Sequence, residues 1–152
     1  MRLALALTAL LTLLPAAQNS GISYGKPEEL KGLKKIFVDT GGDLKNRARI
    51  TKEIEDAKLG VELLDSEAGA EVILDFGAGR SERLIGNIGR GTGGLVTKRY
   101  QTGKGRVFVV GGGRDKIVMS YEGEETHPWE DKPATNFGKA FVKAYKKANG
   151  IK

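Results

Sequence analysis

The chain has no cysteine among its 152 residues and one histidine, His127. Without cysteine there can be no disulfide, no thiolate metal ligand and no lipid attached to a cysteine at a cleavage site. A lone histidine without cysteine partners also excludes nearly every zinc arrangement. We therefore expect neither a metal nor a cofactor. The missing cysteines and the missing Asn-x-Ser/Thr sequon together favour a bacterial source.

Long apolar runs are absent except at the N-terminus. Arg2 precedes an apolar run from Leu3 to Leu14, and Pro15-Ala16-Ala17 ends that run. A positive start, a short apolar stretch and small residues are the layout of a secretory signal peptide. The run has about 12 residues, whereas a membrane-spanning helix needs roughly 20. We expect cleavage after residue 17, no transmembrane segment, and an exported protein that is periplasmic or secreted.

Motifs for nucleotide binding are incomplete. Gly77-Ala78-Gly79 follows an expected strand, but Glu82 stands where a dinucleotide-binding turn has its third glycine. Gly103-Lys104-Gly105 lacks both the earlier glycine and the Ser/Thr of a phosphate-binding loop. The sequence therefore disfavours a nucleotide site.

Carboxylates at strand ends leave one catalytic alternative open. Asp39 and Asp75 lie at or near the ends of the first and third expected strands. If those strands are parallel neighbours, the two side chains approach each other, and paired carboxylates can perform acid–base chemistry or bind a cation. Aspartate is also common at turns for conformational reasons. A small secreted hydrolase that uses Asp39 and Asp75, or His127, is the alternative function.

Positive charge is concentrated in residues 80–116, which carry nine basic residues against two acidic ones. Such asymmetry favours an anionic partner, either an envelope protein or an anionic polymer, although charge of this kind also keeps a protein soluble. Few aromatic residues accompany the basic ones, so we do not expect nucleic acid as the partner. The residues expected to bind the partner are Arg80, Arg83, Arg90, Lys98, Arg99 and Arg106.

The hydrophobic pattern predicts an α+β domain with a single mixed β-sheet and two helices, in the order β-α-β-β-β-β-β-α. Residues 18–32 are expected to form a linker or arm, and residues 33–152 one domain. The glycine-rich segment 77–94 is expected to be a long loop. Helices are expected over 43–58 and 133–148, and strands over 34–39, 61–65, 70–76, 95–101, 106–110 and 116–122.

The expected core follows from the apolar faces of these elements. The residues placed in it are Ile36, Val38, Ile54, Leu63, Ile73, Val107, Val109, Ile117, Phe137 and Phe141.

Residues 34–76 have an order of elements that is known from other proteins. The order is a lysine-flanked strand, a helix and then the strands Val61–Asp65 and Ala70–Leu74. This arrangement resembles the strand-helix-strand halves of bacterial envelope accessory domains, such as the curli-secretion lipoprotein and the amino-terminal domain of the Tol–Pal propeller protein. The resemblance covers about a third of the mature chain and implies a non-catalytic role in assembly or transport. The chain departs from the lipoprotein members because it lacks their anchoring cysteine. The expected function is thus that of an exported, non-enzymatic envelope domain.

Overall fold

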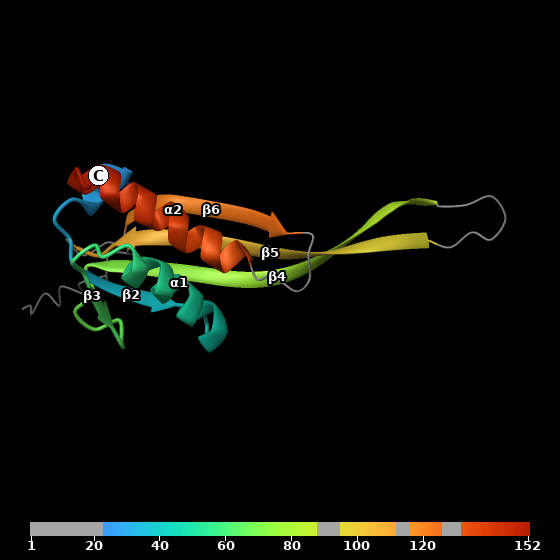
Figure 1. Ribbon diagram of the computed structural model, residues 1–152, viewed down its shortest axis with the longest axis horizontal. Helices are drawn as coiled ribbons and strands as arrows, with labels where there is room; N and C mark the ends of the chain where they lie inside the picture. Colours follow the sequence, from blue (N-terminus) through green and yellow to red (C-terminus); the bar gives the residue numbers. More distant parts are fainter. Residues whose placement is uncertain (1–22, 88–94, 112–115, 126–131) are drawn as a thin grey trace, which may run out of the picture.

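The structure, a computed structural model, describes residues 23–87, 95–111, 116–125 and 132–152. A six-stranded mixed sheet forms one layer, and both helices pack on one of its faces (Figure 1). The expected α+β class with one mixed sheet and two helices is confirmed. The elements are β1 (Ser23–Tyr24), η1 (Pro27–Leu30), β2 (Lys35–Asp39), α1 (Leu44–Asp56), β3 (Glu62–Leu64), β4 (Val72–Asn87), β5 (Leu95–Val109), β6 (Lys116–Glu125) and α2 (Lys132–Asn149).

The strands are arranged in the order β1-β6-β5-β4-β2-β3. β2 pairs in parallel with β3 and β4, whereas β4, β5 and β6 form an antiparallel meander. The starts of β2 and β4 are joined by Glu71, whose carboxylate accepts the backbone N–H groups of Lys34 (2.6 Å) and Lys35 (2.9 Å). These two hydrogen bonds lower the pKa of Glu71, because they favour the charged form.

Helix α1 begins and ends through local signals. The Asp43 side chain accepts the backbone N–H of Asn46 at 3.0 Å and so caps the first turn, at the start of the expected helix 43–58. Ile50 and Ile54 are buried against the sheet. The helix ends at Asp56, two residues before the expected end, and the residue directly after its cap, Lys58, has a left-handed φ of 51°.

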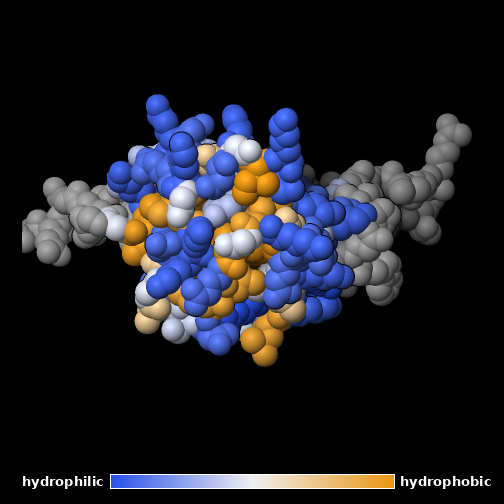
Figure 2. All heavy atoms as spheres, turned by 60° about the vertical axis from the view of Figure 1, so that its left-hand side comes forward, coloured by the Kyte–Doolittle hydropathy of each residue, from blue (hydrophilic) through white to orange (hydrophobic). Residues whose placement is uncertain are grey.

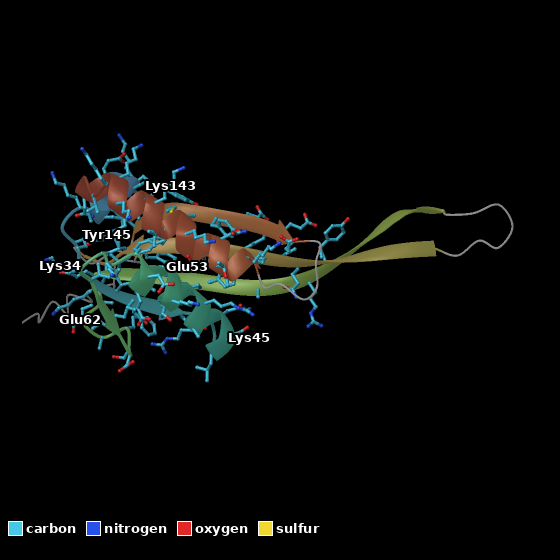
Figure 3. All side chains as sticks on the ribbon, in the orientation of Figure 1. Lys34, Lys45, Glu53, Glu62, Lys143 and Tyr145 are labelled. Atoms are coloured by element: carbon cyan, nitrogen blue, oxygen red, sulfur yellow. The ribbon has the colours of Figure 1, made fainter. Side chains whose placement is uncertain are left out.

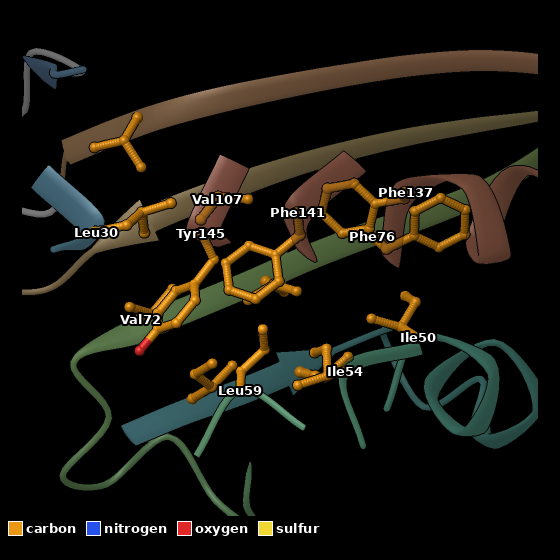
Figure 4. Close-up of a cluster of buried hydrophobic side chains, with 14 of the residues drawn as sticks. Leu30, Ile50, Ile54, Leu59, Val72, Phe76, Val107, Phe137, Phe141 and Tyr145 are labelled. Carbon is orange, nitrogen blue, oxygen red and sulfur yellow. The ribbon is translucent and has the colours of Figure 1, made fainter. Parts of the chain in front are cut away.

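Helix α2 provides the aromatic part of the core (Figure 4). The ring of Phe137 lies 5.5 Å from that of Phe76 and 5.7 Å from that of Tyr121, measured between centroids. One turn further along, Phe141 lies 5.8 Å from Tyr145, whose hydroxyl donates to the Leu33 carbonyl at 2.7 Å. Burial raises the pKa of the Tyr145 hydroxyl. This face therefore anchors α2 on the sheet.

Residues 23–30 belong to the folded unit rather than to a linker. β1 pairs in parallel with the start of β6, and Leu30 of η1 is completely buried in the core. Glu29 forms an ion pair with Lys116 at 3.2 Å. The missed signal is Leu30, an isolated leucine in a polar segment, whose burial depends on contacts with the distant helix α2.

The expected core is confirmed at eight of its ten positions. Leu63 and Val109 are only partly buried and pack on the margin of the core, because Leu63 lies in the edge strand β3 and Val109 is the last residue of β5. The core also includes residues beyond those ten, among them Leu30, Ile50, Val72, Leu74, Phe76 and Tyr145.

The expected loop over 77–94 is wrong for residues 77–87, because β4 continues without interruption to Asn87. Residues 88–94 lie outside the described residues. The separation of the expected strands 95–101 and 106–110 is also wrong, because β5 runs unbroken from Leu95 to Val109. Gly103 and Gly105 lie inside β5 because α2 packs closely there. A Cβ at Gly103 would lie 2.6 Å from Phe76 and Pro133 atoms, and one at Gly105 would lie 2.4 Å from the Phe137 ring. These glycines provide space for the helix, not a turn.

Candidate functional site

The β4–β5 pair extends beyond the rest of the sheet as a two-stranded ribbon (Figure 1). β2 pairs with β4 only as far as Asp75, and β6 pairs with β5 only from Gln101 onward. Farther out, β4 and β5 pair only with each other, up to Asn87 opposite Leu95. We call residues 80–87 and 95–101 the ribbon.

The ribbon contains four of the six expected binding residues. Arg80, Arg83, Lys98 and Arg99 belong to it, and Glu82 is its one acidic residue. The register opposes Arg83 to Lys98 and Glu82 to Arg99. The expected site residue Arg90 lies outside the described residues.

Arg106 lies apart from the other basic residues. Its guanidinium donates to one carboxylate oxygen of Asp75, at 3.1 Å from Nε and 2.5 Å from Nη2. The same guanidinium lies 5.4 Å from the centroid of the Phe108 ring. Arg106 is therefore engaged within the body of the sheet, on the face opposite Val107 and the helices, and it does not extend the ribbon's surface.

The two carboxylates of the catalytic alternative are neighbours, as expected from parallel strands. Asp39 of β2 is in register with Asp75 of β4. Each has another role, however, because Asp75 is ion-paired with Arg106 and the Asp39 side chain accepts the backbone N–H of Gly41 at 2.9 Å. The arrangement stabilises a strand end and a turn. His127, the other catalytic candidate, lies outside the described residues.

A serine motif was also missed from the sequence. Residues 21–25 read Gly-Ile-Ser-Tyr-Gly, the pattern of a nucleophile elbow. An elbow requires a sharp turn from a strand into a helix, but Ser23 lies in β1, paired with Lys116 of β6. In the described ranges there is likewise no group of three or more histidine, aspartate or glutamate residues that could hold a metal ion.

A cleft of about 460 Å³ lies at the base of the ribbon. Exposed Lys45, in the first turn of α1 (Figure 3), and exposed Arg80 both contribute to it, and Phe76 provides a buried apolar surface. Its acidic residue, Asp43, already accepts the backbone N–H and the side-chain amide of Asn46. The lining residues are Asp43, Lys45, Asn46, Phe76, Ala78, Gly79, Arg80, Gln101, Thr102, Pro133 and Ala134.

Lys45 was not indicated by the sequence pattern, because it is separated from the basic stretch by 35 positions and reaches Arg80 only through the fold. Elsewhere the surface is mostly polar. In Figure 2, hydrophilic side chains cover most of the visible side of the body, with smaller apolar areas between them. The fold and site thus define a two-layer α+β domain with a projecting basic ribbon and a polar cleft at its base.

Comparison with known proteins gives a likeness in structure but none in sequence. No family model matches the chain, and no curated protein matches it. Among solved structures, the chain is similar to the uncharacterized lipoprotein B from Nitrosomonas europaea, determined by solution NMR, with a TM-score of 0.44 and 10% sequence identity over 78% of each chain. Within the part of the chain that the structure describes, no helix is both long and apolar enough to cross a membrane.

Proposed function

We propose that the protein is an exported, non-enzymatic binding domain of the bacterial envelope, and that its ribbon and basal cleft bind an anionic partner. The partner is an acidic region of an envelope protein or an anionic envelope polymer. The observation that supports this function is the location of the basic stretch. The fold places four of its basic residues on the part of the sheet that extends beyond the helices.

Two features favour an anion. The ribbon carries four basic residues against one acidic residue, and its register places Arg83 directly opposite Lys98. At the base of the ribbon, Lys45 and Arg80 both border one cleft, so the positive surface continues from the ribbon into the body.

The binding function predicts salt-sensitive retention on heparin, which serves as a polyanion probe. A variant with Arg80, Arg83 and Arg90 changed to Gln should elute at lower salt than the wild type. Exposed charges attract an anion over about 8–10 Å at physiological ionic strength, so their loss weakens binding. The matched control changes Lys139, Lys143 and Lys147 to Gln, three exposed residues of α2. Elution of the ribbon variant together with the wild type would contradict the proposed site.

The exported state predicts removal of the N-terminal segment. Expression of the full chain in a Gram-negative host should give a periplasmic or secreted product that begins near Gln18, because the small residues before it fit signal peptidase. Intact-mass measurement of the purified product checks this. An exported product that retains residues 1–17 would contradict the prediction.

A further inference from the structure

The outer edge of β4 has no partner strand over most of its length. β2 pairs with Val72–Asp75 and then leaves the sheet at Thr40 to enter α1. From Phe76 to Asn87, no described strand pairs with β4 on that side, although β5 pairs with it on the other. Beyond Asp39, no described strand therefore occupies the position beside β4 that β2 fills up to that residue.

Such an edge is a binding feature, because unpaired backbone N–H and C=O groups form a template for another strand. Proteins commonly limit this exposure with very short edge strands, and the two outermost strands here follow that rule. β3 has three residues and β1 has two. The β4 edge from Phe76 to Asn87 has twelve, a length of roughly 40 Å at the usual rise per residue.

We propose that the β4 edge binds an extended acidic segment of a partner protein by strand addition. The added segment lies beside residues 76–87 and continues the row of β2. This inference rests on the proposed binding function and specifies the partner's chemistry and its mode of binding. Main-chain hydrogen bonds to an edge provide affinity in such complexes, while side chains provide selectivity.

The start of this edge lies in an open part of the sheet. A Cβ built at Gly77 would meet no atom within 4 Å, so the face of the sheet from which that Cβ projects is uncovered at this position. Two positions further along, Gly79 and Arg80 line the basal cleft together with Lys45 of α1. An incoming segment would therefore have Arg80 and Lys45 near its start, where the row of β2 ends.

Charge selects the β4 edge over the other long margin of the sheet. β6 also lacks a described partner strand beyond Ile117 on its outer side, but it carries Glu122, Glu124 and Glu125. Glu122 and Glu125 are ion-paired with Lys104 and Lys132, but residues 118–125 of β6 contain no basic residue of their own. Residues 76–87 of β4 carry Arg80 and Arg83 against the single acidic residue Glu82, so an acidic segment is favoured at β4. Because β6 carries these glutamates, the β6 edge of a second copy of this chain could also occupy the β4 edge. The hydrogen-exchange test below distinguishes that dimer from binding of a partner segment.

The test uses the full-length mature protein and two labelled synthetic peptides. The first has ten residues of alternating Glu and Val. The second, the Pro peptide, has the same glutamates with Pro in place of every valine. It lacks the N–H groups of one register entirely, and the fixed φ of about −65° at each Pro disfavours the extended conformation that the other register needs. In fluorescence anisotropy the Val peptide should therefore bind about tenfold more tightly or better than the Pro peptide.

Changing Arg80 and Arg83 to Glu should weaken binding of the Val peptide, whereas the same change at exposed Lys139 and Lys143 of α2 should not. Equal affinity for both peptides would overturn strand addition, while salt-sensitive heparin retention would still support the proposed function. If the Val peptide did not bind, and the ribbon variant eluted from heparin together with the wild type, both strand addition and the proposed binding function would be overturned.

Amide hydrogen exchange followed by NMR supplies a second measurement. The Val peptide should protect alternate residues of 76–87, because successive residues of a strand direct their N–H groups to opposite sides. Protection along β6 instead, or none on β4, would overturn the assignment of the edge. Self-association of the protein without peptide, with protection of β4 and β6 together, would show that a second copy occupies the edge and would also overturn the proposal.

Discussion

Replacing Phe141 with alanine is expected to lower the free energy of unfolding by about 3–5 kcal/mol. The side chain is completely buried, in the middle of α2, and its ring lies 5.8 Å from that of Tyr145. The substitution removes the buried ring and leaves a cavity between α2 and the sheet (Figure 4). Chemical denaturation measures the change, and a loss below about 1 kcal/mol would show that α2 does not pack as described.

The matched control is Lys143→Ala, two residues along the same helix, where the side chain is exposed. Its free energy of unfolding should change by no more than about 0.5 kcal/mol, because surface substitutions away from caps and ion pairs have little effect. Comparable destabilisation by both variants would contradict the role assigned to burial of Phe141, because alanine has the higher helix propensity in both cases and propensity cannot explain the loss.

The parts of the fold that were predicted correctly depend on local signals. An Asp cap begins α1, apolar residues three and four apart define one face of α2, and β-branched residues between lysine and aspartate define β2. Each signal lies within the element that it predicts. Parallel pairing of β2 and β4 also followed, and with it the juxtaposition of Asp39 and Asp75.

The long strands β4 and β5 could not be predicted in this way. Glycine in a strand usually weakens it, so glycine-rich segments indicate turns. Here the register opposes Gly77 to Lys104 and Phe76 to Gly105 across one continuous ladder. The reason for Gly105 is the Phe137 ring, 32 positions away in the sequence, and no local pattern contains that contact.

The candidate site was predicted in composition but not in arrangement. Net charge identified the basic stretch, since charge is a property of the sequence alone. Whether a basic residue is available depends on its partner across the sheet. Arg106 is opposed to Asp75 and ion-paired with it, whereas Arg83 is opposed to Lys98. Lys45 joins the site only because α1 begins beside Arg80.

Changing Gly105 to alanine is expected to destabilise the protein by about 1–3 kcal/mol, the usual cost of overpacking a core. The added Cβ would lie 2.4–2.8 Å from three atoms of the Phe137 ring. That ring cannot move aside freely, because it is fully buried and held between Phe76 and Tyr121. Thermal and chemical denaturation measure the loss.

Gly77→Ala provides the matched control, a glycine-to-alanine change on the neighbouring strand. A Cβ there would meet nothing within 4 Å, so steric crowding is absent. The unfolded chain loses conformational freedom when alanine replaces glycine, and the control should therefore be neutral or more stable by about 0.5–1 kcal/mol. Opposite signs for the two variants would establish that Gly105 is required for close packing of α2. If Gly105→Ala were as stable as Gly77→Ala, the helix would have to lie farther from β5 than in this fold.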